Sequence, residues 1–467
     1  MSQPDDATFW SITQLSTAIQ SNRRSPVEVV EAFLARIAKH DGKLHAFTEV
    51  FSAEARLAAQ AAENAIRSGH SLGPLHGIPI ALKDLIDIEG RISTHGCGAW
   101  GDLKATRTAT LVRRLIAQGM IVLGKTHMVE FAMGGWGTNQ RMGTPWNPWD
   151  PLVARTPGGS SSGSGVAVAA GLAPWAVGSD TGGSVRLPAS WCGLTALKTS
   201  TGRISNHGLL PLSPTLDTPG PMARSVEDTA LLYEAMQGPD PLDRRTLGLP
   251  LHNGLPSLRR GVAGLRLARM PDSERAGVAP AVLDAYDASL EALARLGAKI
   301  QPLILPCAFA DVAALNGRIM SAEGYALWAD KIDDATLALD EDVRPRLSSG
   351  RDISARAYLA ALAERERLGQ AFASALSQVD ALLTPTTLHT ALPLESVDQG
   401  KAPSHFTRFA NFLDLCALAL PNGFDREGLP ISLQIIGRRY DEETVLRIGQ
   451  AYQTATDWHT RRPPMAG

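Results

Sequence analysis

Apolar residues recur at every third or fourth position over several stretches of the chain, which is the pattern of helices that bury one face. The clearest helix start is Ser25-Pro26-Val27-Glu28, which supplies an N-cap residue, a proline for the first helical position and a capping-box glutamate. Val27, Val30, Leu34 and Ile37 then share one face of this helix. The same reasoning predicts helices over about residues 110–118, 280–296, 308–329, 355–376 and 442–454.

Short apolar runs separate the helices from His76 onward. They predict strands at residues 77–82, 121–123, 299–305 and 431–436, and the alternation of strand and helix predicts an α/β fold. Because the chain has neither an internal repeat nor a long linker, we expect a single domain over residues 1–467. Its expected parts are an N-terminal helical part (1–75), a core (76–236), a variable helical insertion (237–380) and a C-terminal part of the core (381–467).

The composition indicates a folded chain with a sizeable core, since 44% of the 467 residues are hydrophobic. The 45 Lys and Arg nearly balance the 47 Asp and Glu, and a net charge of -2 gives no general attraction to nucleic acid or to an acidic membrane. The longest apolar stretch, residues 165–178, is too short and too interrupted to cross a bilayer. We therefore expect a soluble protein that does not bind nucleic acid directly or insert into membranes.

Cysteine usage points to a reducing compartment. Cys97, Cys192, Cys307 and Cys416 are scattered, with no C-x-x-C pair and no histidine spacing typical of zinc. Residues 1–6 are acidic where a signal peptide would be basic. The sequence therefore predicts a cytoplasmic protein without a metal site.

A glycine- and serine-rich cluster at residues 158–165 allows more than one interpretation. Such a composition can be a flexible linker, but this cluster runs directly into the apolar stretch 166–170, as a loop does when it enters a buried helix. It also matches G-x-S-x-G, which would make Ser161 a nucleophile served by a later histidine such as His389 or His405. The segment before it, residues 149–157, contains two prolines and resembles a loop rather than the strand that this motif requires.

A second cluster, residues 180–184, is better suited to chemistry. The backbone N–H groups of Thr181, Gly182, Gly183 and Ser184 could point at one oxygen, because the two glycines tolerate unusual conformations. Such a nest stabilises the oxyanion formed when a serine attacks a carbonyl, and Ser184 is the serine beside it. The alternative is a plain tight turn before residues 185–188.

A serine nucleophile needs a base, and Lys83 is placed to be one. It follows the apolar strand 77–82 directly, although most lysines lie at the surface. Burial at the end of an interior strand would lower the pKa of its amine, so that it could accept a proton near neutral pH. Lysine replaces histidine in some serine enzymes.

Lys83, Ser160 and Ser184, in this order, resemble the catalytic elements of the amidase-signature family of serine hydrolases. The resemblance covers nearly the whole chain, and Ser162 is a departure, because many members have glycine there. The segments that carry the resemblance are residues 77–84, 123–126, 130–134, 147–150, 158–164, 178–186, 216–221 and 428–437.

The resemblance implies a function and a fold. Ser184 would be the acylated nucleophile, Ser160 a bridging serine after a cis peptide bond, and Lys83 the base. The fold would be a mixed β-sheet core covered by helices on both faces. The reaction would convert a small-molecule carboxamide and water into a carboxylate and ammonia or an amine, without a metal or an organic cofactor.

Candidates for substrate binding follow from position alone, near the signature segments. They are Met133, Gly134, Trp136, Asn139 and Trp191, although either tryptophan could equally pack the core. The chain could also form a homo-oligomer.

Two other functions stay open. The A subunit of the tRNA-dependent amidotransferase shares the scaffold and works with partner subunits, but residues 135–140 here (Gly-Trp-Gly-Thr-Asn-Gln) differ from the Ser-Ser-Thr-Glu-Asn-Ser typical of that protein. This difference favours a small-molecule amidase. A catalytically silent scaffold is the other alternative, and the intact Lys83, Ser160 and Ser184 argue against it.

Overall fold

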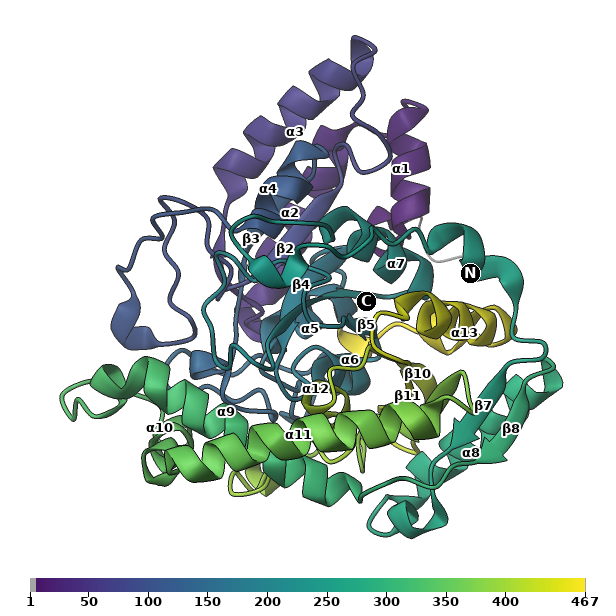
Figure 1. Ribbon diagram of the computed structural model, residues 1–467. Helices are drawn as coiled ribbons and strands as arrows, with labels where there is room; N and C mark the ends of the chain where they lie inside the picture. Colours follow the sequence, from purple (N-terminus) through teal and green to yellow (C-terminus); the bar gives the residue numbers. More distant parts are fainter. Residues whose placement is uncertain (1–5, 467) are drawn as a thin grey trace.

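The computed structural model describes residues 6–466, and these residues form one sheet of eleven strands (Figure 1). The strand order is β1-β3-β2-β4-β6-β5-β10-β11-β9-β7-β8. The strands are β1 (Phe47–Val50), β2 (Pro79–Lys83), β3 (Ile121–Thr126), β4 (Trp175–Asp180), β5 (Thr195–Lys198), β6 (Thr218–Ala223), β7 (Arg266–Arg269), β8 (Lys299–Pro302), β9 (Ala381–Pro385), β10 (Ala417–Phe424) and β11 (Pro430–Ile436).

The sheet is mixed, as predicted. β2 pairs in parallel with both β3 and β4, and β7 pairs in parallel with β8 and β9, while the remaining pairs are antiparallel. Every residue of β2, β4, β6, β9 and β11 is buried, which is typical of strands that are covered on both faces.

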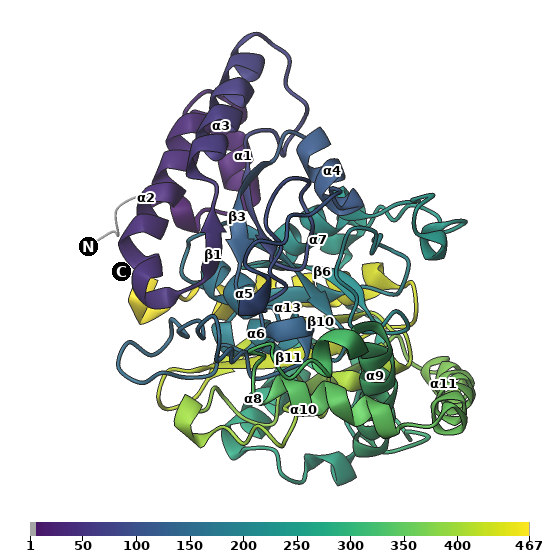
Figure 2. The ribbon, with the colours of Figure 1, turned by 90° about the vertical axis from the view of Figure 1, so that its left-hand side faces the viewer.

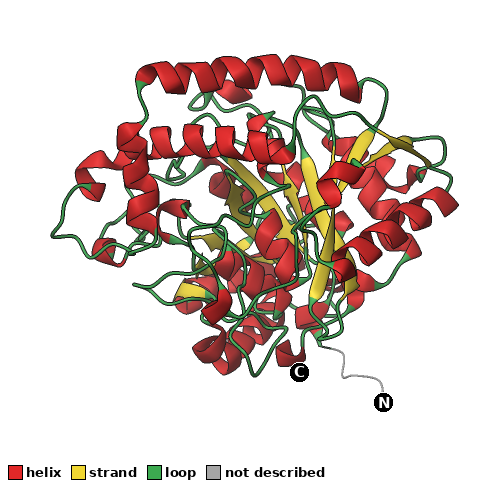
Figure 3. Cartoon of the chain, turned by 90° about the horizontal axis from the view of Figure 1, so that it is seen from below, coloured by secondary structure: helices red, strands yellow, loops and turns green. Residues whose placement is uncertain are grey.

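Helices cover both faces of the sheet (Figure 3). Neighbouring residues of a strand point to opposite faces, and on β11 Gln434 hydrogen-bonds Arg186 of α6 while Ile435 lies near Gly449 of α13. The helices are α1 (Ile12–Gln20), α2 (Pro26–Leu44), α3 (Ser52–Arg67), α4 (Thr110–Ala117), α5 (Ser162–Ala169), α6 (Arg186–Cys192), α7 (Val226–Met236), α8 (Pro280–Arg295), α9 (Phe309–Ile332), α10 (Val343–Ser348), α11 (Ala355–Leu376), α12 (Arg408–Phe412) and α13 (Glu442–Ala455). Figure 2 shows α1, α2 and α3 gathered at one end of the molecule, with α9, α10 and α11 at the other.

The predicted start of α2 is confirmed. The Ser25 hydroxyl accepts a hydrogen bond from the Glu28 N–H (3.0 Å), and the Glu28 carboxylate accepts one from the Ser25 N–H (2.8 Å). This reciprocal pair satisfies N–H groups that have no partner inside a helix. The face of α2 that carries Val30, Leu34 and Ile37 is buried, as the spacing predicts.

Two parts of the chain differ from the expectation. The N-terminal part, expected to be helical, contains β1, which is too short to show an alternating pattern and is specified by its pairing with β3. The segment 237–380 is largely helical; its predicted strand at 299–305 is present as β8, and β7, which was not predicted, pairs with β8 in the same sheet. The acidic residues 1–5 lie outside the described residues, and within 6–466 no helix combines the length and the apolar character needed to cross a bilayer.

Gly124 offers a test of the β1–β3 pairing. A Cβ atom at this position would lie 2.2 Å from the backbone oxygen of Glu49 on β1, so Gly124→Ala must push β1 away from the sheet edge. We expect the free energy of unfolding, measured by denaturant titration, to fall by about 1–3 kcal/mol. Gly42→Ala in α2 is the control, because no atom lies within 4 Å of its added Cβ, and it should leave stability unchanged or raise it by up to about 1 kcal/mol. Equal stability of the two variants would contradict this account.

Candidate active site

The candidate site lies where β2 and β4 end at the same edge of the sheet. Lys83 is the last residue of β2 and is completely buried. Its Nζ atom lies 2.7 Å from the Ser160 hydroxyl and 2.9 Å from the Ser179 hydroxyl, and Ser179 comes from the parallel strand β4. The structure therefore gives Lys83 two neutral hydroxyl partners.

The environment of Lys83 favours its uncharged form. Burial lowers the pKa of this lysine from 10.5 to about 7, even though the nearby carboxylates of Asp217 and Asp180 act in the opposite direction. A substantial fraction of the amine is therefore unprotonated at neutral pH and can accept a proton.

The loop that carries Ser160 is rigidly held. The peptide bond between Gly159 and Ser160 is cis, as the resemblance implies. The Gly159 N–H donates to the Gly135 carbonyl (2.8 Å), and the Ser160 carbonyl accepts from the Val129 N–H (3.1 Å). Residues 156–170 are all buried, so the flexible-linker interpretation of this cluster is wrong.

Ser184 lies just before α6, and its side chain borders a cavity of about 400 Å³. Its carbonyl accepts a hydrogen bond from the Ser161 N–H (3.2 Å), which ties the two serine-bearing loops together. Among the described residues, none forms a hydrogen bond with the Ser184 hydroxyl. The structure thus joins Lys83 to Ser160 by a side-chain hydrogen bond. Within residues 6–466, no side-chain hydrogen bond joins Ser160 to Ser184.

The four predicted oxyanion donors are not equivalent. The Gly183 N–H already donates to Asp180 Oδ1 (2.7 Å), whereas those of Thr181, Gly182 and Ser184 have no acceptor within residues 6–466. Gly183 is therefore removed from the predicted set of oxyanion donors. Its φ of +129° and the 2.3 Å that would separate an added Cβ from Thr407 Oγ1 show that this position needs glycine for its conformation.

A buried ion pair between Asp180 and Arg186 holds the same loop in place. The sequence analysis assigned no role to either residue. Arg186 donates to both carboxylate oxygens of Asp180 at 3.0 Å, and neither side chain is exposed. Burial alone would raise the pKa of Asp180, but the charge and hydrogen bonds of Arg186 outweigh it and lower the pKa to about 2. The remaining Arg186 donors reach Asn411, Gln434 and the Thr407 carbonyl. The only signal in the sequence was that Asp180 and Arg186 both fall within the matching segment 178–186.

Ser161 is not served by a histidine. Its buried hydroxyl exchanges hydrogen bonds with the backbone of Ser179 (3.3 Å each). His389 hydrogen-bonds the Thr390 carbonyl and stacks on a tryptophan, while His405 lies beside Glu274. The nucleophile-elbow interpretation is therefore wrong, because the Ser161 hydroxyl is held by backbone groups and both histidines have other partners.

The predicted substrate residues divide into two groups. Met133, Gly134 and Trp136 line the cavity beside Ser184. Asn139 is buried elsewhere and donates to the carbonyls of Gly96 (2.8 Å) and Met128 (2.9 Å), so its amide shapes a loop.

Trp191 likewise belongs to the packing. It is fully buried and stacks on Trp136, with ring centroids 5.5 Å apart. Its indole N–H donates to the His389 carbonyl (2.9 Å). Asn139 and Trp191 are therefore corrected to supporting residues, since neither lines the cavity.

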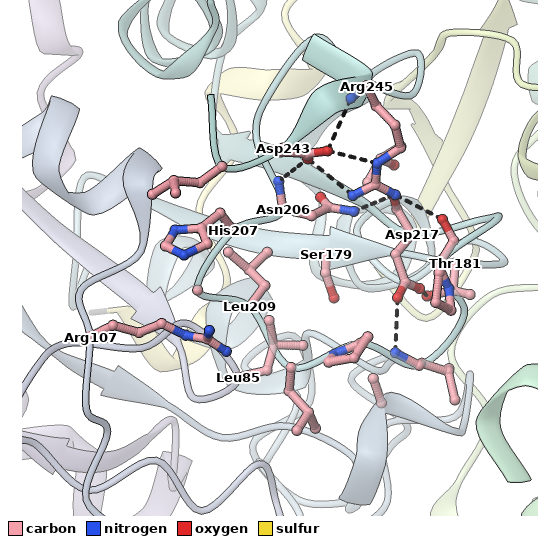
Figure 4. Close-up of a pocket in the computed structure, with 18 residues that line it drawn as sticks. Leu85, Arg107, Ser179, Thr181, Asn206, His207, Leu209, Asp217, Asp243 and Arg245 are labelled. Carbon is pink, nitrogen blue, oxygen red and sulfur yellow. Dashed lines mark hydrogen bonds and ion pairs between the residues drawn. The ribbon is translucent and has the colours of Figure 1, made fainter. Parts of the chain in front are cut away.

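A second pocket, of about 280 Å³, is lined by Ser179, Thr181 and Asp217 among others (Figure 4). Its lining includes Ser179, which hydrogen-bonds Lys83, and Thr181, whose hydroxyl donates to Asp217. Burial raises the pKa of Asp217 to about 6, partly offset by hydrogen bonds from Thr181 and two backbone N–H groups. Ala132 borders both pockets.

Metal ligation has no obvious place in the described part of the chain. Within residues 6–466, no three His, Cys, Asp or Glu side chains are grouped as a metal ion would require.

Comparison with known proteins gives consistent results. The family model described as Amidase matches residues 28–446. The A subunit of glutamyl-tRNA(Gln) amidotransferase from Chloroflexus aggregans is 35% identical, over 98% of this chain and 99% of that protein. A solved structure described as a vestigial protein complex that reveals the origins of an s-triazine catabolic enzyme has a TM-score of 0.89 and 34% identity, covering 95% of this chain and 98% of that one. Native peptide amidase from Stenotrophomonas maltophilia has a TM-score of 0.86 and 30% identity, covering 97% and 98%.

Proposed function

We propose, from the premise that this chain belongs to the amidase family, that it cleaves the C–N bond of a small carboxamide through an acyl-enzyme on Ser184. The observation that carries the proposal is the buried Lys83 amine, 2.7 Å from the Ser160 hydroxyl. A buried lysine without a hydrogen-bonded carboxylate partner is costly for stability, and its use as a base accounts for it.

The proposed reaction begins when neutral Lys83 takes the Ser160 proton while Ser160 takes the Ser184 proton. The Ser184 oxygen attacks the amide carbonyl, and the free N–H groups of the 181–184 loop hold the resulting oxyanion. The C–N bond breaks as the relay returns a proton to the departing nitrogen, which leaves as ammonia or an amine. Water, deprotonated by the same relay, then attacks the acyl-enzyme and releases the carboxylic acid.

A second candidate function is that of the glutamine-hydrolysing component of an amidotransferase. Relatives named as A subunits of glutamyl-tRNA(Gln) amidotransferase match 98% of this chain, including one from Ralstonia nicotianae that is 38% identical. In this role the acyl-enzyme would form from glutamine, and the ammonia would pass to a partner protein instead of to solvent. The site chemistry is the same in both functions, so the substrate and the need for partners separate them.

Replacement of the nucleophile tests the proposal directly. Ser184→Ala should lower amide hydrolysis by at least about 1,000-fold across a panel of small amides, and a fluorophosphonate probe should label the wild type but not this variant. Ser162→Ala is a matched control, because the buried Ser162 hydroxyl has no hydrogen-bond partner among the described residues, and it should keep its labelling. Labelling of Ser184→Ala would overturn the assignment.

The pH profile tests the base. Only unprotonated Lys83 accepts a proton, so kcat/KM should rise with pH, about tenfold per unit below pH 7, and level off above the pKa of about 7. Lys83→Ala should leave a slow activity that keeps rising at higher pH, because hydroxide then replaces the amine. A wild-type rate that stays constant from about pH 5.5 to 8 would contradict a lysine base with this pKa.

A glutaminase assay separates the two candidate functions. The isolated chain should hydrolyse small amides, and adding the partner subunits of a tRNA-dependent amidotransferase should not change the rate. Glutamine hydrolysis that appears only with those subunits would instead identify the chain as the glutamine-hydrolysing part of such a complex. Ser184→Ala serves as the blank in both arms.

A further inference from the structure

The cavity beside Ser184 carries positive charge that the protein does not neutralise locally. Arg346 and Arg408 both line it. Within the described residues neither forms an ion pair with a carboxylate, and no Asp or Glu lines this cavity. An amide alone has no charge to match these two guanidinium groups.

Arg408 is the less satisfied of the two. Its Nη1 atom donates to the Ala313 carbonyl (3.0 Å), but its Nε atom is buried and has no hydrogen-bond partner among the described residues. Burial, together with the charge of Arg346, lowers the pKa of Arg408 to about 10, so the side chain stays charged at neutral pH. A buried charged donor without an acceptor is costly unless a ligand supplies one.

Asn316 on α9 presents the same feature. Its side chain is completely buried, and neither its amide nitrogen nor its amide oxygen has a hydrogen-bond partner within residues 6–466. A Cβ atom added at Gly182 would lie 3.5 Å from Asn316 Oδ1 and 3.6 Å from Arg408 Nε. Both unsatisfied groups therefore lie beside the loop that precedes Ser184, but only Arg408 lines the cavity, and Asn316 lies next to it outside the lining.

Arg346 has a different role in the cavity. Its donors are engaged by the Met133 carbonyl (3.2 Å) and by the backbone and side-chain oxygens of Gln399 (2.7 Å each). It contributes charge to the cavity but offers no free donor comparable to Arg408 Nε. Burial lowers the pKa of Arg346, while the carboxylates of Asp342 and Asp340, neither of which lines the cavity, act in the opposite direction.

We propose that Arg408 forms an anion subsite for a carboxylate on the substrate, with Asn316 beside it as a positioning residue, so that the preferred substrates are small amides that also carry an ionised carboxyl group. This rests on the proposed amidase function. The Arg408 guanidinium would donate to the carboxylate, a pairing that gives strong, charge-assisted hydrogen bonds. Gly182 and Ser184 are two residues apart and thus at most about 7 Å from each other, which places the carboxylate a few bonds from the scissile carbonyl.

Binding to the Ser184→Ala protein tests the subsite without turnover. The probes are malonamate, succinamate and glutaramate, each compared with the neutral amide in which a methyl ketone replaces the carboxylate. Titration calorimetry should show at least one half-amide binding about tenfold or more tightly than its neutral counterpart, as expected for a charge-assisted contact. If none of the three binds more tightly than its counterpart, the proposal is overturned.

Two substitutions in the same Ser184→Ala background assign the preference to residues. Arg408→Met should weaken half-amide binding about 10- to 100-fold and neutral-amide binding less than about threefold. Arg318→Met, at an exposed arginine on the same helix as Asn316, is the control and should change neither. Equal weakening of both ligand classes by Arg408→Met would show a structural role and overturn the proposal.

Asn316→Leu provides a variant that should fold well. It breaks no hydrogen bond of the described protein, so the melting temperature should be unchanged or higher, while half-amide binding should weaken. Unchanged half-amide binding would remove Asn316 from the subsite.

Failure of the subsite can be told from failure of the enzyme. Ser184-dependent hydrolysis of neutral amides, without any preference for half-amides, would support the proposed function and overturn the proposed subsite. Absence of both hydrolysis and fluorophosphonate labelling would end the proposed function, whatever the calorimetry shows.

Discussion

The removal of the Lys83 amine from water is the constraint on which the site depends. An exposed lysine stays protonated near neutral pH and cannot act as a base. Burial at the end of β2 lowers its pKa to about 7, and the parallel pairing of β2 with β4 places the hydroxyl of Ser179 beside it. The buried loop before α5 places the Ser160 hydroxyl 2.7 Å from the same amine. The central strands thus prepare an amine that can lose its charge and still keep hydrogen-bond partners.

Two other buried basic groups show why the partners matter as much as the burial. Lys125, on the adjacent strand β3, is equally buried but forms an ion pair with Asp84 (3.0 Å). Arg186 forms a two-pronged ion pair with Asp180, whose pKa falls to about 2, so this carboxylate stays ionised. Lys83 differs because its direct partners are hydroxyls, which stabilise a neutral amine as well as a charged one. The fold thus uses buried charge pairs to fix its loops, and in the proposed mechanism the unpaired Lys83 amine is the group that transfers the proton.

The sequence predicted those features that depend on neighbouring residues. The capping box at Ser25 defined the start of α2, Lys83 and Ser184 stood out by their local contexts, and Ser160, which lies 2.7 Å from Lys83, followed from the family resemblance. Features that depend on segments far apart in the chain were missed. The four-residue β1 is set by its pairing with β3, and Arg186 meets Asn411 across 225 residues. The sequence also could not predict which side chains of an irregular loop face the cavity. Trp136 borders it, whereas Asn139, only three residues later, does not.

The charge of the cavity and the pKa of Lys83 constrain each other. A carboxylate brought near Lys83 would favour its protonated form and raise its pKa, which would slow a reaction that needs the neutral amine. A guanidinium remains charged throughout this pH range, so its pairing with the carboxylate cancels most of the negative field at the point of binding. Arg408, together with the charge of Arg346, would therefore both select an anionic substrate and protect the base from that substrate. Because a neutral amide needs no such protection, the uncompensated arginines fit a site adapted to a charged substrate better than one adapted to a simple amide.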